Sequence, residues 1–220
     1  MISQALALAR KDLLVELRSR QFIGAMLAFT LVTIVTLNFA FDLLREQRAE
    51  NGAGALWIAF LFAGSLGIGR TIAAERDRGT LDGLLLTPVD SGVLFAGKFL
   101  GALISLLVVE AIALPVFAIL YDVPALQPRM WLVALVGSAG FVGLGTLFSA
   151  IAARGRAREV LLPLLLFPLV IPILIASVRA TALLFGADGD GFWRWFNLLV
   201  GFDVIFIVLA FLGFGYVLEE

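Results

Sequence analysis

The stretch Glu75–Val89 reads ERDRGTLDGLLLTPV and lies between two long apolar runs, Ala53–Ala73 and Phe99–Tyr121. Each run has about the 20 residues that a helix needs to cross a bilayer. The stretch between them is far too short for a soluble domain, and it carries charges, glycines and a terminating proline. The pattern predicts two membrane-spanning helices joined on one side of the membrane by a short helix over about residues 80–87.

The composition of the whole chain supports a membrane protein. The 220 residues are 61% hydrophobic and 15% charged, whereas a soluble domain carries about 25% charged residues. The net charge of −1 gives no general attraction to nucleic acid. With no cysteine and no histidine, the chain lacks the residues of disulfide frameworks, most zinc sites and most nucleophile–base pairs. We therefore predict no catalytic and no metal-binding residues.

Six apolar runs are long enough to span the membrane, and none alternates as the strands of a β-barrel would. Backbone groups inside lipid must bond within their own segment, so the runs are predicted to be helices. The sequence thus predicts an all-α integral membrane protein, with one transmembrane domain over residues 1–220. The predicted spans are Phe22–Phe41, Ala53–Ala73, Phe99–Tyr121, Met130–Ala153, Val160–Val178 and Leu198–Leu218.

Residues 1–20 are predicted to form an amphipathic helix on the inner membrane surface. A signal peptide is not indicated, because Arg10 and Lys11 follow the short apolar run instead of preceding it. An unstructured cytoplasmic tail is the alternative. The helical reading depends on apolar residues that recur at helical spacing: Ile2, Leu6, Ala9, Leu13 and Leu17.

The distribution of Lys and Arg predicts the orientation. Of the sixteen basic residues, eleven lie in the N-terminal segment, the second connection and the fourth connection. Cytoplasmic connections carry the excess of basic residues. Both termini are therefore predicted to be cytoplasmic.

Small residues spaced four apart at Gly97, Gly101 and Ser105 predict a helix face that packs closely against a neighbour. Gly92–Lys98 (GVLFAGK) fits the start of a phosphate-binding loop, but Phe99 follows where such a loop needs Ser or Thr. We interpret Lys98 as a lysine that extends from the start of a span towards the membrane surface.

The segment after Glu75 has the features of a docking helix. Thr80 can cap a helix, Leu81, Leu84 and Leu85 give it an apolar face, and Pro88 ends it. A helix of two turns with exposed leucines is unstable alone in water. It suits a groove on a soluble partner; a connection lying on the membrane is the alternative.

This arrangement resembles the permease subunits of the type-2 ABC exporter class, which have six spans and a coupling helix between spans two and three. The resemblance implies that a separate ABC ATPase subunit contacts this segment and that the chain itself hydrolyses no nucleotide. The residues that carry the pattern and would contact the ATPase are Glu75, Arg76, Gly79, Thr80, Leu81, Leu84, Leu85 and Pro88.

The fifth predicted span makes the resemblance more specific, because it points to one family within this class. Leu161–Ala176 reads LLPLLLFPLVIPILIA, and Pro163, Pro168 and Pro172 are predicted to kink it. The run is similar to the proline-rich fifth span of the haem exporter B family, the membrane subunits of the ABC transporter for cytochrome c maturation.

Membership of that family would imply a role in haem export or delivery, in the inner membrane of a bacterium. The implied partners are an ABC ATPase, a haem-handling membrane subunit, an outer haem chaperone and a second permease copy. ATP would bind the partner ATPase, and haem would be handled by the complex, not bound as a cofactor of this chain. Without the family, a type-2 permease for a lipid, drug or polysaccharide is the alternative, followed by a membrane scaffold or a secondary carrier.

Two acidic residues, Glu110 and Asp203, fall inside predicted spans three and six. Ionisable groups inside a membrane are costly and are often functional. Each side chain either has a structural role, neutral or bonded to a neighbouring helix, or is coupled to motion or partner binding.

Overall fold

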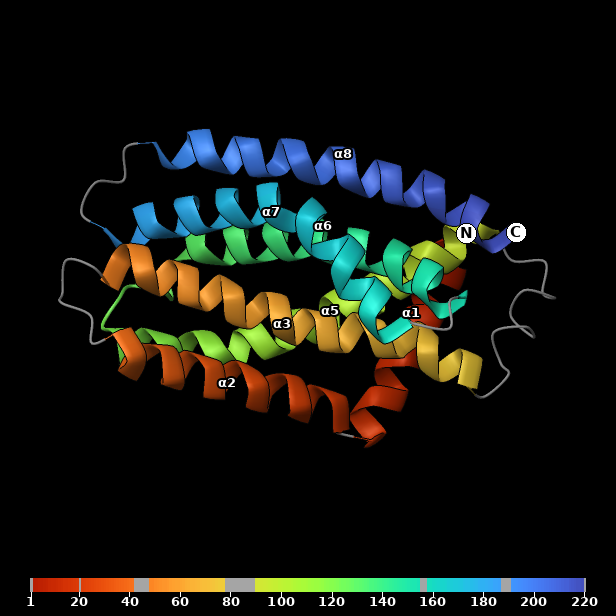
Figure 1. Cartoon of the computed structure of the whole chain (residues 1–220), viewed down its shortest axis with the longest axis horizontal. Helices are drawn as coiled ribbons and strands as arrows, with labels where there is room; N and C mark the ends of the chain where they lie inside the picture. The colour runs from red at the N-terminus through yellow and green to blue at the C-terminus, as the bar shows by residue number, and fades with distance from the viewer. Residues whose placement is uncertain are drawn as a thin grey trace.

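The computed structural model describes residues 2–19, 21–41, 48–77, 90–154, 158–186 and 191–219, with side chains for 2–16, 22–41, 49–68, 90–152, 166–186 and 191–217. Throughout these residues, every regular element is a helix, as predicted. The helices run roughly along one axis, and both chain termini lie at the same end, here called the terminal end (Figure 1). They are α1 (Ile2–Ser19), α2 (Gln21–Phe41), α3 (Arg48–Asp77), α5 (Ser91–Tyr121), α6 (Pro128–Arg154), α7 (Arg158–Phe185) and α8 (Phe192–Glu219).

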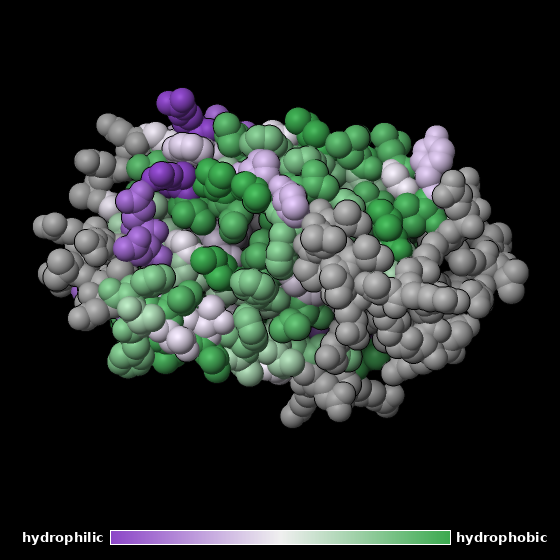
Figure 2. Space-filling view, viewed as in Figure 1, coloured by the Kyte–Doolittle hydropathy of each residue, from purple (hydrophilic) through white to green (hydrophobic). Residues whose placement is uncertain are grey.

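All helices except α1 are long and apolar enough to cross a membrane, so the described part of the chain contains the six predicted spans. Hydrophobic side chains cover most of the visible middle of the bundle (Figure 2). Lipid accepts such a surface, because it is as apolar as the side chains themselves. The protein is therefore a multi-pass membrane protein.

Helix α6 occupies the centre of the bundle. It packs against α3, α5, α7 and α8, and 67% of its span is buried, compared with 17% for α2 and 22% for α8. Glycines on α6 allow these approaches: a Cβ on Gly145 would lie 2.6 Å from Ile68 of α3, and one on Gly143 would lie 2.9 Å from Ile207 of α8. Because small residues let helix backbones approach closely, α6 can be contacted from several sides at once.

The helices extend beyond the predicted spans. Helix α5 begins at Ser91 instead of Phe99, and Asp90 caps it, since its carboxylate accepts a hydrogen bond of 2.9 Å from the backbone N–H of Gly92. At the other end, Asp122 adopts the left-handed conformation with φ of 53°. Helices α7 and α8 likewise extend towards each other, so the last connection is shorter than the sequence predicted.

Candidate functional site

The first candidate region is the segment between α3 and α5. Glu75 and Arg76 lie in the last turn of α3, which ends at Asp77. The facing ends of α3 and α5 both lie at the terminal end of the bundle (Figure 1). The other residues predicted to contact an ATPase fall outside the described residues: Gly79, Thr80, Leu81, Leu84, Leu85 and Pro88. The docking helix therefore stays a prediction.

Helix α1 lies against the first half of α5, with the two backbones close together. A Cβ on Gly97 would lie 2.7 Å from the Cβ of Leu8 and 3.2 Å from the carbonyl oxygen of Ala5. A Cβ on Gly101 would lie 3.5 Å from the Cβ of Asp12. The close packing predicted for this face of α5 is confirmed, and its partner is the N-terminal helix.

Two polar contacts fix α1 on that face. The Lys98 ammonium donates a hydrogen bond of 2.9 Å to Asp12, and Ser105 donates one of 2.6 Å to Glu16. The Lys98 side chain is only 3% exposed, so the interpretation of Lys98 as a lysine that reaches the membrane surface was wrong. A lysine so deeply buried needs an anion beside it, and α1 supplies the carboxylate.

Glu16 is half-buried at the same contact. Burial raises the pKa of its carboxyl, the hydrogen bond from Ser105 acts in the opposite direction, and the nearby Asp12 carboxylate raises the pKa further. When α1 lies on α5, the ionised form of Glu16 is therefore less favourable than it is in water.

The second candidate region is the membrane interior around α6, where α5 contributes Glu110. This side chain is completely buried and accepts a short hydrogen bond from the hydroxyl of Ser138 on α6. Its other oxygen, Oε2, has no hydrogen-bond partner among the described residues. Glu110 thus joins α5 to α6 by one bond and keeps one acceptor unsatisfied.

Asp203 of α8 approaches another side of α6. A Cβ on Gly140 would lie 1.9 Å from Asp203 Oδ1 and 2.9 Å from Ile173 Cδ1 of α7. The Asp203 residue is 4% exposed. Its carboxyl lies against the Gly140 backbone without hydrogen-bond geometry, and neither oxygen has a partner in the part of the chain that the structure describes. Only glycine at position 140 leaves space for this carboxyl.

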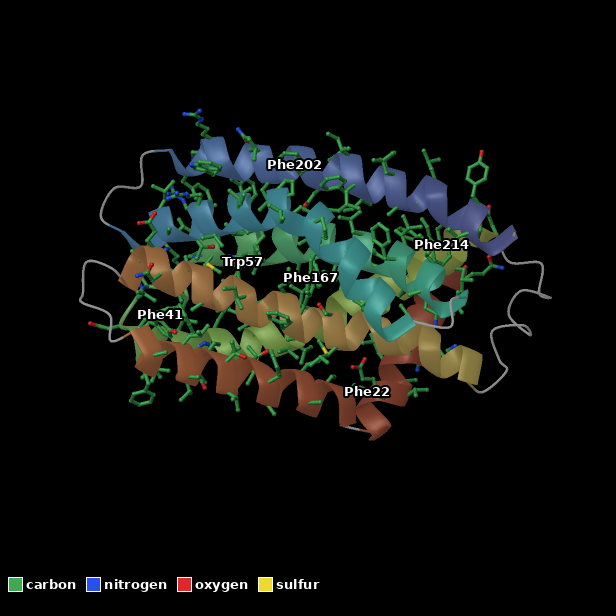
Figure 3. All side chains as sticks on the ribbon, viewed as in Figure 1. Phe22, Phe41, Trp57, Phe167, Phe202 and Phe214 are labelled. Atoms are coloured by element: carbon green, nitrogen blue, oxygen red, sulfur yellow. The ribbon has the colours of Figure 1, made fainter. Side chains whose placement is uncertain are left out.

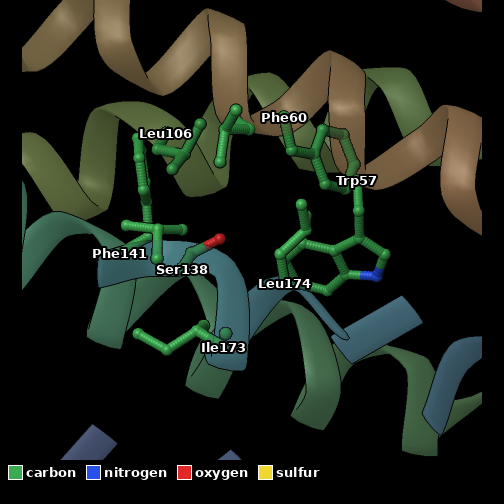
Figure 4. A pocket seen from close by; sticks show the side chains of 10 residues that line it. Trp57, Phe60, Leu106, Ser138, Phe141, Ile173 and Leu174 are labelled. Carbon is green, nitrogen blue, oxygen red and sulfur yellow. The ribbon is translucent and has the colours of Figure 1, made fainter. Parts of the chain in front are cut away.

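A small cavity of about 10 Å³, enough for about one water molecule, lies between α3, α5, α6 and α7. The side chains that line it are apolar apart from the hydroxyl of Ser138 and the indole nitrogen of Trp57 (Figure 4). Beside it, Trp57 donates a hydrogen bond of 2.9 Å to Thr181, and Gly137 leaves space for Trp57 and Ser177. The cavity is too small and too apolar to hold haem or another large substrate in this conformation.

The end of the bundle opposite the termini is held by bonds from side chains to backbone carbonyls. Phe41, at this end of α2, and Phe22, at the other, mark the length of that helix in Figure 3. Tyr121 donates to Ile34 at 3.1 Å, Asn38 to Leu120 at 3.3 Å and Gln127 to Leu184 at 2.9 Å. Together these bonds connect α2 to α5 and connect the α5–α6 connection to α7.

Pro163, Pro168 and Pro172 all lie within α7, which continues as one helix through them. Their predicted role as kinks stays a prediction. Helix α5 contains a further proline, Pro115. Among the described side chains, no group of three or more His, Cys, Asp or Glu residues could hold a metal ion.

Sequence reasoning missed the partners of these candidate residues. From the sequence alone, no contact was predicted for Asp12, Glu16, Ser138 or Gly140. A signal was present: Asp12 and Glu16 are four apart, as are Gly101 and Ser105, so two helix faces with matching period could pair.

Comparison with known proteins gives consistent matches. A family model described as CcmB protein matches residues 3–219. A protein named Heme exporter protein B from Rhodobacter capsulatus is 31% identical over 185 residues, which cover 83% of this chain and 84% of that protein. Proteins of the same name from Paracoccus denitrificans (30% over 176 residues, 79% and 80% covered) and Bradyrhizobium diazoefficiens (26% over 208 residues, 93% and 92% covered) are also similar.

Proposed function

The chain belongs to the CcmB protein family, and on this premise we propose that it is the permease subunit of an ABC transporter that exports or delivers haem for c-type cytochrome assembly. The observation that carries the proposal is the family match over nearly the whole chain, together with relatives named for haem export. The six spans agree with a permease. We place the protein in the bacterial inner membrane with both termini in the cytoplasm.

The energy source in this proposal is a partner ABC ATPase that contacts the segment between α3 and α5. Three features support this location. The sequence of the segment places leucines at helical spacing in a charged stretch. The end of α3 and the start of α5 both lie at the terminal end (Figure 1). The connections at that end carry the basic excess expected of a cytoplasmic face. The predicted contacts are Glu75, Arg76, Gly79, Thr80, Leu81, Leu84, Leu85 and Pro88.

Movement of that segment would reach the membrane interior through α3 and α5, because both helices pack against α6. The α3–α6 contact is tight: a Cβ on Gly64 would lie 2.3 Å from Cε1 of Phe141. Closely packed helices switch between discrete arrangements more readily than they bend. ATP-driven displacement would therefore change the packing of α6 against its neighbours. The prolines of α7 would supply a kinked element in this movement.

Haem itself would be held mainly by other subunits. The chain has no histidine and no cysteine, which are common axial ligands of haem iron, and tyrosine is a less common one. The hydroxyl of Tyr121 is buried and bonded to Ile34, and Tyr216 is 77% exposed on α8. We therefore propose a haem-handling membrane subunit, an outer haem chaperone and a second permease copy as partners, with ATP use tied to haem transfer or to release of the chaperone.

The docking proposal is tested by co-purification in mild detergent. The chain carrying Leu81→Asp and Leu85→Asp should lose its ATPase subunit, because two carboxylates would have to enter an apolar groove. Leu126→Asp is the matched control: Leu126 is 51% exposed in the connection at the opposite end, and this variant should retain the ATPase. Full retention by the double variant would refute the docking site.

The haem proposal is tested separately by the yield of c-type cytochromes in a bacterium whose own copy has been deleted. The native chain should restore the yield and the Leu81/Leu85 double variant should not. Normal cytochrome yield without the chain, combined with loss of a lipid, drug or polysaccharide from the cell surface, would favour the alternative substrate class.

A further inference from the structure

Asp203 differs from every other described acid in its surroundings. It is 4% exposed, lies within the α8 span and has no hydrogen-bond partner for either carboxylate oxygen among the described residues. Glu110, the other buried acid among the described residues, accepts a hydrogen bond from Ser138. An ionised carboxylate in such a place would be very unfavourable, whereas a neutral carboxyl is tolerated.

Among the described side chains, no cation pairs with Asp203. The helices packed against α8 are α5, α6 and α7. Of their charged groups, Lys98 pairs with Asp12, Arg179 pairs with Glu50, and Arg129 lies over the rings of Phe192 and Trp193. Arg154, Arg158 and Glu159 lie at the ends of α6 and α7 nearest the terminal end, and Glu110 bonds Ser138. On α8 itself, Arg194 is nine residues away, about 13 Å along the helix axis.

The space for the carboxyl is built by glycine. Asp203 and Ile207, one turn apart on α8, lie against Gly140 and Gly143 of α6, and a Cβ on Gly140 would overlap Asp203 Oδ1 at 1.9 Å. Ser138 and Gly140 are two residues apart, so they face nearly opposite sides of α6. The Asp203 contact is therefore separate from the Glu110–Ser138 bond and lies at the α6–α8 interface, with Ile173 of α7 beside it.

We propose that Asp203 is a proton-binding site inside the membrane, which holds its proton while α8 is packed against Gly140 and releases it when the two helices separate and water enters. The ligand is a hydrogen ion, and no covalent bond other than O–H forms or breaks. The consequence is that a higher pH favours separation of α8 from α6. This inference does not depend on the identity of the transported substrate or of the ATPase.

The test is infrared spectroscopy of the full chain in lipid bilayers, which reports protonated carboxyl groups directly. We expect a protonated-carboxyl band at neutral pH that is lost in the Asp203→Asn variant. A second band, from Glu110, should be lost in the Glu110→Gln variant instead. The Asp203→Asn variant keeps the size of the side chain, so it should still fold. Absence of any Asp203-dependent band between acid and neutral pH would overturn the proposal.

The link to helix separation is tested with a pair of glycine variants at the same interface. Gly140→Ala forces the Asp203 carboxyl away from α6, and we expect it to lose the Asp203 band at neutral pH and to make Asp203 reactive with a water-soluble carbodiimide. Gly213→Ala is the matched control, because its Cβ would be in ordinary contact with Leu147 at 3.6 Å. An unchanged Asp203 band in Gly140→Ala, or its loss in Gly213→Ala as well, would refute the separation step.

Discussion

Replacing Asp12 with asparagine should release α1 from α5. Asp12 is the anion beside the buried Lys98, with 2.9 Å between Oδ2 and Nζ and with side-chain exposures of 12% and 3%. The substitution keeps the shape of the side chain and its hydrogen-bond acceptor but removes its charge. Lys98, which is only 3% exposed, then loses the charge of the carboxylate that accepts its hydrogen bond.

The magnitude follows from the burial of the pair. Removing one partner of a buried ion pair costs about 3–5 kcal/mol, mostly because the other charge stays buried. The asparagine oxygen can still accept a hydrogen bond and Asp12 is partly exposed, so we expect a smaller cost of about 2–3 kcal/mol for undocking of α1. At 1.4 kcal/mol for each factor of ten, the undocked population should rise about 30- to 140-fold.

Protease release of an N-terminal tag measures this population. Cleavage within α1 requires the helix to open, and its rate follows the open population when reclosing is fast. Purified protein in detergent would be treated with subtilisin, which has broad specificity, and release of the tag would be timed. The control is Lys11→Met, which removes an exposed neighbour 3.4 Å from Asp12; it should change the rate by no more than a few fold, since exposed pairs contribute about 0–1 kcal/mol.

A compensating variant tests whether the buried charge of Lys98 causes the release of α1. Asp12→Asn together with Lys98→Met removes the buried charge, and protection of α1 should return towards the native level. If Asp12→Asn released the tag at the native rate, Lys98 would not need α1 as its counter-ion. If Lys98→Met failed to restore protection in that background, the loss would have a cause other than an unpaired charge.

Further predictions concern single contacts. Burial raises the pKa of Glu16, so its ionisation opposes docking and the thermal midpoint should fall as the pH rises from the usual glutamate range towards the raised value; Glu16→Gln should flatten that slope of midpoint against pH. Gly64→Ala, whose Cβ would lie 2.3 Å from the Phe141 ring, should destabilise the protein by about 1–3 kcal/mol in thermal unfolding, and adding Phe141→Leu should recover part of that loss. Trp57→Phe leaves the Thr181 hydroxyl without its donor at a cost of about 1–3 kcal/mol, and adding Thr181→Val should reduce that cost in the same unfolding assay.

Much of the fold could be predicted because the bilayer imposes it locally. Each span needs about 20 apolar residues and must bond its backbone internally, so runs such as Phe22–Phe41 are recognised without knowledge of their neighbours. The small face of α5 was also predictable, because Gly97, Gly101 and Ser105 share one side of any helix. The helix that this face contacts could not be predicted.

The interpretation of Lys98 was wrong because a lysine beside an apolar run usually marks the membrane boundary. Span three was predicted to begin at Phe99, directly after Lys98; helix α5 begins earlier, at Ser91, and Lys98 is buried inside the protein. A lysine alone indicates a membrane boundary. The same lysine opposite Asp12, which is 86 residues away in sequence, is an internal ion pair.

The sequence by itself determined the class of the protein, its six spans, its N-terminal helix and, through the resemblance of its motifs, its family. These properties depend on the composition and period of short segments. Only the tertiary structure decided that α1 seats on α5, that α6 is central, and that Glu110 and Asp203 approach α6 at Ser138 and Gly140. Those outcomes depend on which helix faces meet, and in lipid that choice is made by close packing and a few polar contacts between distant segments, not by hydrophobicity.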